Sequence, residues 1–350
     1  MSKHNTIPKI QPIHIDMRGE NYAFNGCGRL VMDNLGESDY NYSFFAGLTG
    51  DNFTQFYPYH GIPNHGCRKA RGESATDYRV GKAYIENIFA EIGYLSEFVT
   101  AREVFADKEH FTCKLLKSID RGVPVIQFNY YWSALVGYES DGDIILRIVH
   151  EDTEPTGFSL GVELFDTLAK PGDAWQDYCA WVFIGEKTEK KNLASLYRNA
   201  ILRLPKLLTT KTDDYCFGAQ AFREWANEIE RGKIFADGMT DDNKWWDYCN
   251  YVCNFETNAY CCHGFLQKAK ELNPDLAFLD KVSELYKSMS TELTVGGGLE
   301  QFGGGFNVTY EVLQNLEKRK AIADKLREYA VNVDEVVRMI TDKKAEGKIV

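Results

Sequence analysis

The sequence predicts an α+β fold, with a mixed N-terminal domain, residues 1–187, followed by an all-α C-terminal domain, residues 193–350. Strand-forming patterns gather in one block, residues 123–186, and helical patterns precede it. Helical periodicity dominates the chain beyond residue 193, and the charged hinge "KTEKKN" separates the two regions. The length of 350 residues suits about two hydrophobic cores.

The first part of the N-terminal domain has helical patterns. A short helix is predicted over residues 27–36, with a glycine on each side of its first residue and Gly36 at its end. The segment 78–101 contains an amphipathic helix, and a second helix is predicted over 110–122. The apolar face of the amphipathic helix repeats every three or four residues, at Ile85, Ile88, Phe89 and Ile92.

Residues 123–186 carry the pattern of an antiparallel sheet. Strands are predicted over 123–128 and 131–138, followed by the turn "ESDGD" and a strand over 144–149. The Asp-Gly pair in this turn is a strong hairpin signal. A helix at "VELFDTLAKPG" and a last strand over 179–186 complete the domain. Helices that precede an antiparallel sheet are typical of the α+β class.

The C-terminal domain has helical periodicity over five segments, 193–208, 217–233, 243–273, 276–294 and 308–343. Two glycine triplets in "TVGGGLEQFGGGFN" interrupt this pattern. No strand precedes the triplets and no Gly-Lys-Ser/Thr follows them, so they indicate a loop rather than a phosphate-binding motif.

Composition excludes several classes of function. A formal net charge of −11 disfavours nucleic acid as a partner. The first 20 residues lack the apolar core of a signal peptide, and no stretch approaches the ~18–20 apolar residues that cross a membrane. We therefore expect a cytoplasmic protein without a membrane partner, whose nine cysteines are reduced thiols.

The cysteine-rich segment "CNYVCNFETNAYCCHGF", residues 249–265, raises the question of a metal site. Its spacing lacks the paired Cys-x-x-Cys knuckles of structural zinc, and its aromatic residues continue a helical pattern. We expect a packed helix here, with no metal and no cofactor.

Cys27 is the candidate nucleophile. A nucleophilic cysteine needs a lowered pKa, a base and donors for an oxyanion, and a helix N-terminus supplies the first. Cys27 stands at the start of the predicted helix, so its own backbone amide is a candidate oxyanion donor. Asn21, six residues upstream, is a candidate second donor. The alternative is a small, buried and inert thiol beside a turn.

The segment "YWSALVGYESDGDIILRIVHED" resembles the histidine-bearing hairpin of papain-like cysteine peptidases. The chain as a whole is similar to the butirosin-biosynthesis protein H group, in which a papain-like domain precedes a helical domain. The segments "AFREWANEIERG", "TNAYCCHGFLQKAKEL" and "VSELYKSMSTELT" resemble that helical domain. The resemblance implies acyl transfer through a cysteine thioester, with an acyl carrier protein as a candidate partner.

The sequence departs from the papain-like pattern where the base belongs. Tyr131 stands at the expected histidine position, and Asn21 replaces the oxyanion glutamine. His150 or Asp152 would stand where the orienting residue belongs, and the loop segment "YPYHGIPNHGC" offers His60 and His65 as other bases. Loss of general acid–base help costs ~10²–10⁴ in rate, and thioester chemistry tolerates it better than amide hydrolysis does.

Two functions are favoured at this stage, and a purely structural interaction protein is a third, weaker alternative. The first is a cysteine-dependent acyltransferase or amide/thioester hydrolase that acts through a Cys27 thioester. The second is a catalytically impaired papain-like scaffold that binds a small metabolite or peptide, because Tyr131 replaces the histidine. In both cases aromatic and polar residues would line the cleft, namely Tyr22, Phe45, Asp51, Gln55, Tyr131 and Trp132. The oligomeric state is open, with a homodimer among the options.

Overall fold

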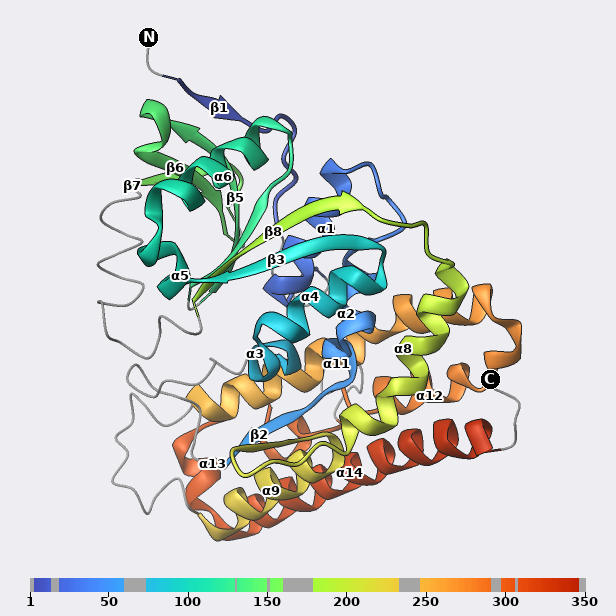
Figure 1. Cartoon of the computed structure of the whole chain (residues 1–350). Coiled ribbons are helices and arrows are strands. Elements are labelled where there is room, and N and C mark those ends of the chain that lie inside the picture. Colours follow the sequence, from blue (N-terminus) through green and yellow to red (C-terminus); the bar gives the residue numbers. More distant parts are fainter. Residues whose placement is uncertain are drawn as a thin grey trace. The chain divides into compact units, whose positions relative to one another are not determined.

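The structure is a computed structural model that describes residues 3–13, 19–59, 74–129, 131–149, 152–159, 179–232, 246–290, 297–305 and 308–345, with the backbone alone for 246–250. It is a mixed α and β structure with an antiparallel sheet and a mainly helical C-terminal region (Figure 1). The chain divides into two compact units. The first contains the described residues up to Phe45 and from Thr76 to Asn192, and the second contains the others.

The first unit is built on a seven-stranded antiparallel sheet. Six strands follow one path, in the order β3 (Tyr94–Thr100), β8 (Ala180–Lys187), β4 (Val125–Asn129), β5 (Tyr131–Glu139), β6 (Ile144–Ile148) and β7 (Thr156–Ser159). The short strand β1 (Asn5–Thr6) pairs with the far end of β5. The expected strands and hairpin turn of residues 123–186 are therefore present, while the expected helix "VELFDTLAKPG" lies outside the described residues.

Helices cover both faces of this sheet. α5 (Ala101–Ala106) and α6 (Lys108–Asp120) lie on one face, and α1 (Ala23–Asn34) and α4 (Lys82–Glu91) lie on the other (Figure 1). Side chains alternate between the faces along each strand. On the α6 side, a buried apolar cluster joins helix and strand residues, among them Leu115, Ile119, Val125, Leu135, Trp181 and Phe183.

Strand β3 is missing from the sequence-based prediction, although it pairs along its length with β8. The residues of β3 follow an amphipathic helix and precede another helix, so their strand character is hidden in a longer helical pattern. A capping box marks the end of the strand: the Thr100 side chain accepts the N–H of Glu103, and the Glu103 carboxylate accepts the N–H of Thr100.

The second unit is mainly helical. α14 packs against α9 and α8, and α11 packs against α12 and α8. Its helices are α8 (Leu193–Leu208), α9 (Gly218–Arg231), α11 (Trp246–Leu272), α12 (Leu279–Lys287), α13 (Tyr310–Gln314) and α14 (Leu316–Ala345). In α11, Cys262 is buried and Cys253 is exposed, and the Nδ1 atom of His263 contacts the Ser283 hydroxyl. The described residues contain no group of three metal-ligating side chains.

A two-stranded sheet also belongs to the second unit, so this unit is not all-α. β2 (Phe56–Pro58) pairs antiparallel with β9 (Tyr215–Phe217). Before β2, residues 42–49 form helix α2 (Tyr42–Thr49), which the sequence analysis does not predict. The division between the units falls within α2, after Phe45, so residues 46–59 belong to the second unit although the sequence analysis assigns them to the first domain.

Gly50 and Gly47 have different roles from each other. Gly50 has a φ of 80° and ends α2, as a turn glycine does. Gly47 lies inside α2 against the ring of Phe265, where an added Cβ would be 2.0 Å from a ring carbon. Gly47 is therefore required for close packing between α2 and α11.

Among the described residues, no helix combines the length and the apolar character that a membrane crossing requires.

We expect Gly47→Ala to destabilise the second unit by about 1–3 kcal/mol, because the new methyl group overpacks against the buried Phe265 ring. Urea denaturation followed by fluorescence measures the loss. Gly81→Ala is the matched control, since a Cβ at Gly81 has no heavy atom within 4 Å. Equal stabilities of the two variants would contradict the packing role of Gly47.

Candidate functional site around Cys27

Helix α1 begins four residues earlier than the sequence predicts, and this changes the position of Cys27. The carbonyl of Tyr22 accepts the N–H groups of Asn25 and Gly26, at 2.9 and 3.2 Å, so the helix begins at Ala23. Cys27 is then the fifth helical residue. In an α-helix that begins at Ala23, the N–H of Cys27 donates to the Ala23 carbonyl. The amide predicted to bind an oxyanion is thus used within the helix.

The thiol of Cys27 is fully buried. Burial raises the pKa of this thiol far above its ordinary value of 9.0, and the nearby Glu20 carboxylate raises it further. The Arg29 guanidinium opposes the increase without overcoming it. The nucleophilic form of cysteine is the thiolate, so the environment of Cys27 disfavours nucleophilic attack.

The glycines on either side of Cys27 are explained by close packing. A Cβ on Gly26 would be 2.7 Å from the Ile13 side chain, and a Cβ on Gly28 would be 3.0 Å from the Phe45 ring. Residues 24–32 are all buried, so α1 packs against protein on every side. Small residues at positions 26–28 allow this close approach.

Arg29 holds the chain that precedes α1 against the helix. Its guanidinium donates to both carboxylate oxygens of Glu20, at 2.6 and 2.7 Å, and to the Pro12 carbonyl at 2.7 Å. A further bond of 3.1 Å joins it to Asp33, one turn along α1. The side chains of Arg29 and Glu20 are only 10% and 13% exposed, so each charge depends on the other.

Tyr131 and Trp132 face opposite sides of the sheet, as neighbours on a strand do. The Trp132 ring packs on Phe24 of α1, with centroids 4.7 Å apart, and its Nε1–H donates to the buried Asp77 carboxylate at 2.8 Å. Tyr131 is 45% exposed and points to the other face of β5. The residue at the expected histidine position is thus directed away from the face on which α1 packs.

Two of the predicted ligand-binding residues of the first unit are packing residues. The Phe45 ring is fully buried beside Gly28 and 6.1 Å from the Phe89 ring. Tyr22 is 4% exposed, and its backbone N–H donates to the Tyr42 hydroxyl oxygen at 3.2 Å. Asn21 is half-buried and lies two residues before α1.

The predicted orienting acid, Asp152, is used by its own turn. Its carboxylate accepts the N–H of Val149 at 3.1 Å, directly after β6. His60, His65 and His150 lie outside the described residues.

Asp51 and Gln55 lie in the second unit and are buried, with 0% and 1% exposure. The Gln55 carbonyl accepts the N–H of Gly218, and its side chain donates to Phe56. Asp51 begins a short 3₁₀ helix whose next residue, Asn52, donates to the Cys261 carbonyl at 3.0 Å. Asn52 thus ties the segment to α11 and Gln55 ties it to the start of α9, whereas Asp51 and Gln55 were predicted to line a cleft.

Sequence reasoning missed the two buried polar contacts that position α1 and β5. Asp77 and Trp132 are 55 residues apart, so no local pattern connects them. The Arg29–Asp33 spacing of four residues is a readable helix signal, but the larger contribution from Glu20 is visible only in the folded chain.

No model of a known protein family matches the chain, and no curated protein matches it at a significant level.

We expect Arg29→Met to lower the free energy of unfolding by about 3–5 kcal/mol, because the substitution leaves the buried Glu20 carboxylate without its cation. The double variant Arg29→Met/Glu20→Gln removes both charges and should recover part of this loss. Urea denaturation measures both. A loss below about 1 kcal/mol in the single variant would mean that water replaces the guanidinium.

The stability of the protein should fall at alkaline pH, in part through Cys27. The unfolded chain releases the thiol proton near pH 9 while the folded chain retains it, so the free energy of unfolding decreases as the pH rises above 9. From pH 8 to pH 10 this one group accounts for about 1.4 kcal/mol.

Cys27→Ala tests this contribution. The variant should be less stable than the parent at pH 8 because it leaves a small cavity, but it should lose about 1.4 kcal/mol less between pH 8 and pH 10. Other buried thiols and tyrosines titrate equally in both proteins and cancel in the comparison. Parallel stability curves would show that the Cys27 thiol is accessible to ionisation.

Proposed function

We propose that the chain is a ligand-binding protein on a papain-like scaffold, in which Cys27 is a structural thiol and not a nucleophile. The resemblance of the β5–β6 hairpin to the histidine-bearing hairpin of papain-like peptidases supports the scaffold. The arrangement of α1 on an antiparallel sheet within an α+β unit agrees with it. The expected ligand is a small metabolite or a peptide.

The main support for this proposal is the complete burial of the Cys27 side chain. A free thiol with the ordinary pKa of 9.0 is only ~1% ionised at pH 7, and the raised pKa of Cys27 makes its ionised fraction far smaller. A nucleophile must also reach the carbonyl it attacks, and the Cys27 side chain has no exposed surface. Its amide is used within α1, and Tyr131 faces away from that helix.

Acyl transfer through Cys27, with an acyl carrier protein as donor, is the competing function. It needs a thiolate that an acyl group can reach, and therefore an opening of the packing around α1. The two functions make opposite predictions about covalent labelling, which a single experiment can separate.

The experiment combines intact-mass and peptide-mass measurements after incubation with an acyl N-acetylcysteamine thioester and, separately, with iodoacetamide at pH 8. We expect modification of the exposed thiols Cys113 and Cys253, and no modification of Cys27 in the folded protein. Urea should make Cys27 reactive, since unfolding restores its ordinary pKa and removes its burial.

Cys27→Ala is the control. The labelling of the folded protein should be the same in the parent and the variant, and saturable ligand binding should survive the substitution. An acyl adduct on Cys27 that the variant lacks would overturn the proposal in favour of acyl transfer.

A further inference from the structure

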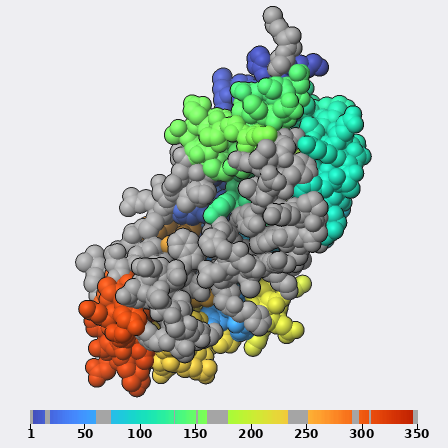
Figure 2. Space-filling view, turned by 90° about the vertical axis from the view of Figure 1, so that its left-hand side faces the viewer, coloured from blue at the N-terminus to red at the C-terminus, as the bar shows by residue number. Residues whose placement is uncertain are grey.

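Residues 3–7 form an arm, here called the N-terminal arm, that lies along the far end of β5. Its strand β1 pairs antiparallel with β5, and its residues Lys3, His4 and Thr6 are exposed. In Figure 1 the arm lies at one end of the sheet of the first unit. Figure 2 shows N-terminal residues (blue) at the surface, next to residues of the β6–β7 region (green). The arm is thus placed where another protein molecule can approach it.

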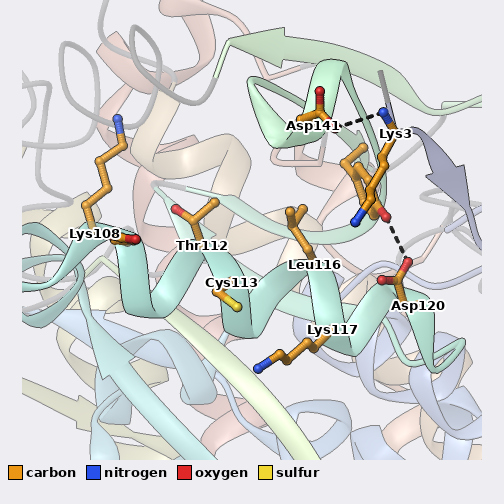
Figure 3. Close-up of a pocket in the computed structure, with 10 residues that line it drawn as sticks. Lys3, Lys108, Thr112, Cys113, Leu116, Lys117, Asp120 and Asp141 are labelled. Carbon is orange, nitrogen blue, oxygen red and sulfur yellow. Dashed lines mark hydrogen bonds between the residues drawn. The ribbon is translucent and has the colours of Figure 1, made fainter. Parts of the chain in front are cut away.

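The arm binds to a surface formed by the end of α6, the end of β5 and the turn after β5. The backbone N–H of Lys3 donates to Oδ1 of Asp141 at 2.9 Å, and the Lys3 carbonyl accepts the N–H of Asp141 at 3.0 Å (Figure 3). The Asn5 side-chain amide donates to Oδ1 of Asp120, which also accepts the Tyr138 hydroxyl, both at 2.9 Å. We call this surface the acceptor edge and define it by Asp120, Val136, Gly137, Tyr138 and Asp141.

The acceptor edge also fits the arm in shape. A Cβ on Gly137 would be 2.9 Å from the carbonyl oxygen of Asn5 and 2.9 Å from Oγ1 of Thr6, so glycine is needed for this close approach. The N–H of Ile7 donates to the Val136 carbonyl at 2.9 Å, and the Ile7 side chain joins the buried cluster on the α6 side of the sheet. One buried side chain and a few hydrogen bonds hold the arm, so its detachment exposes little apolar surface.

The turn that connects the arm to the rest of the chain is strained. This turn contains Pro8 and Lys9, and Lys9 has a φ of 60°. The left-handed region disfavours a residue with a Cβ by about tenfold, a cost that glycine avoids. In the described part of the chain, the other non-glycine residues with positive φ are Ser140 and Asp141, which form the β5–β6 turn, where hairpins use such values. Ile10 packs against the buried cluster, so the strained turn is short.

Exchange of the arm between two copies of the chain would remove this strain. In one chain, the turn at Lys9 must bring the arm back onto its own acceptor edge. An extended connection lets the same arm reach the acceptor edge of a second copy. The exchanged arm makes the same hydrogen bonds, so only the turn changes. Strained hinge loops are a general cause of exchange between identical chains.

We propose that two copies of the chain associate by exchanging their N-terminal arms, so that residues 3–7 of each copy occupy the acceptor edge of the other. Association costs the second copy its translational and rotational freedom, and the relief of strain at two hinges offsets part of that cost. The dimer therefore forms at high protein concentration. This self-association goes beyond the ligand binding proposed above and does not depend on it.

Two substitutions at the exposed Lys9 should shift the monomer–dimer equilibrium in opposite directions. Lys9→Gly adopts the left-handed turn without strain and should weaken the dimer about a hundredfold, which is about tenfold for each hinge. Lys9→Pro cannot adopt a positive φ and should strengthen the dimer by about tenfold or more. Lys9→Gln removes the charge but keeps the strain, so it is the matched control and should behave as the parent does. Sedimentation equilibrium measures the dissociation constants.

A mixing experiment shows whether the dimer uses the arm. In the Lys9→Pro background, Ile7→Asp damages the arm and leaves the acceptor edge intact, whereas Gly137→Ala blocks the acceptor edge and leaves the arm intact. Neither variant should self-associate, because each exchanged contact needs an intact arm and an intact acceptor edge. A mixture of the two should form a heterodimer, which native mass spectrometry detects.

Three results would overturn the inference. The first is a Lys9→Pro variant that stays monomeric at all concentrations, and the second is equal dissociation constants for Lys9→Gly and Lys9→Pro. The third is a mixture of the Ile7→Asp and Gly137→Ala variants that associates no better than either variant alone, with circular dichroism showing that both are folded. If either variant fails to fold, the Lys9 series decides alone. Labelling of Cys27 tests the proposed function separately, since neither the arm nor the acceptor edge contains this residue.

Discussion

The first unit depends on the complete burial of α1. Nine consecutive residues of this helix, 24–32, are buried, so neighbouring elements must pack around its whole circumference. Phe24 fills the space between the helix and Trp132 of the sheet, and Phe45 closes the side at Gly28. A helix in this position accepts a charged residue only with internal partners, which Arg29 obtains from Glu20, Asp33 and Pro12. The same burial that orders the unit also keeps the Cys27 thiol protonated.

The stretch "NGCG" has two physical explanations that sequence alone does not separate. Small residues around a cysteine are typical of a helix tip that approaches a substrate, and they are equally typical of a helix that approaches other protein. Which explanation applies depends on the residue at which the helix begins, and neither Gly26 nor Gly28 determines that starting residue. The first turn of α1 is formed by residues that precede the glycines, and its stability comes from burial of Phe24 rather than from a capping side chain, which Tyr22 does not supply.

Periodicity predicted much of the fold. It failed where contacts between distant segments determine the secondary structure. The strands β4, β5, β6 and β8 and the helices α8, α9 and α11 have clear patterns of their own, so their positions agree with the sequence to within a few residues. The single helix predicted over 308–343 is instead two helices, α13 and α14, separated at Asn315. β3 is a strand because β8 pairs with it, and Gly47 allows α2 to pack closely on Phe265, a contact that no local pattern shows. The buried polar residues Asp51 and Gln55 resembled a cleft lining for a related reason: a sequence shows that a residue is polar, but not whether its partners are water or buried backbone.

Because the Cys27 thiol is buried and protonated, we expect a ligand to bind elsewhere than at the N-terminal end of α1. The family resemblance directs attention to the end of α1, but packing fills that region with Trp132, Phe45 and the Arg29 ion pairs. On the opposite face of the sheet, α6 buries one side in the apolar cluster and leaves the other side accessible beside Lys3. On the proposed papain-like scaffold, Tyr131 in place of a histidine leaves no chemical reason to keep the Cys27 thiol accessible. Burial of the thiol instead lets the small Cys27 side chain contribute to the packing of α1.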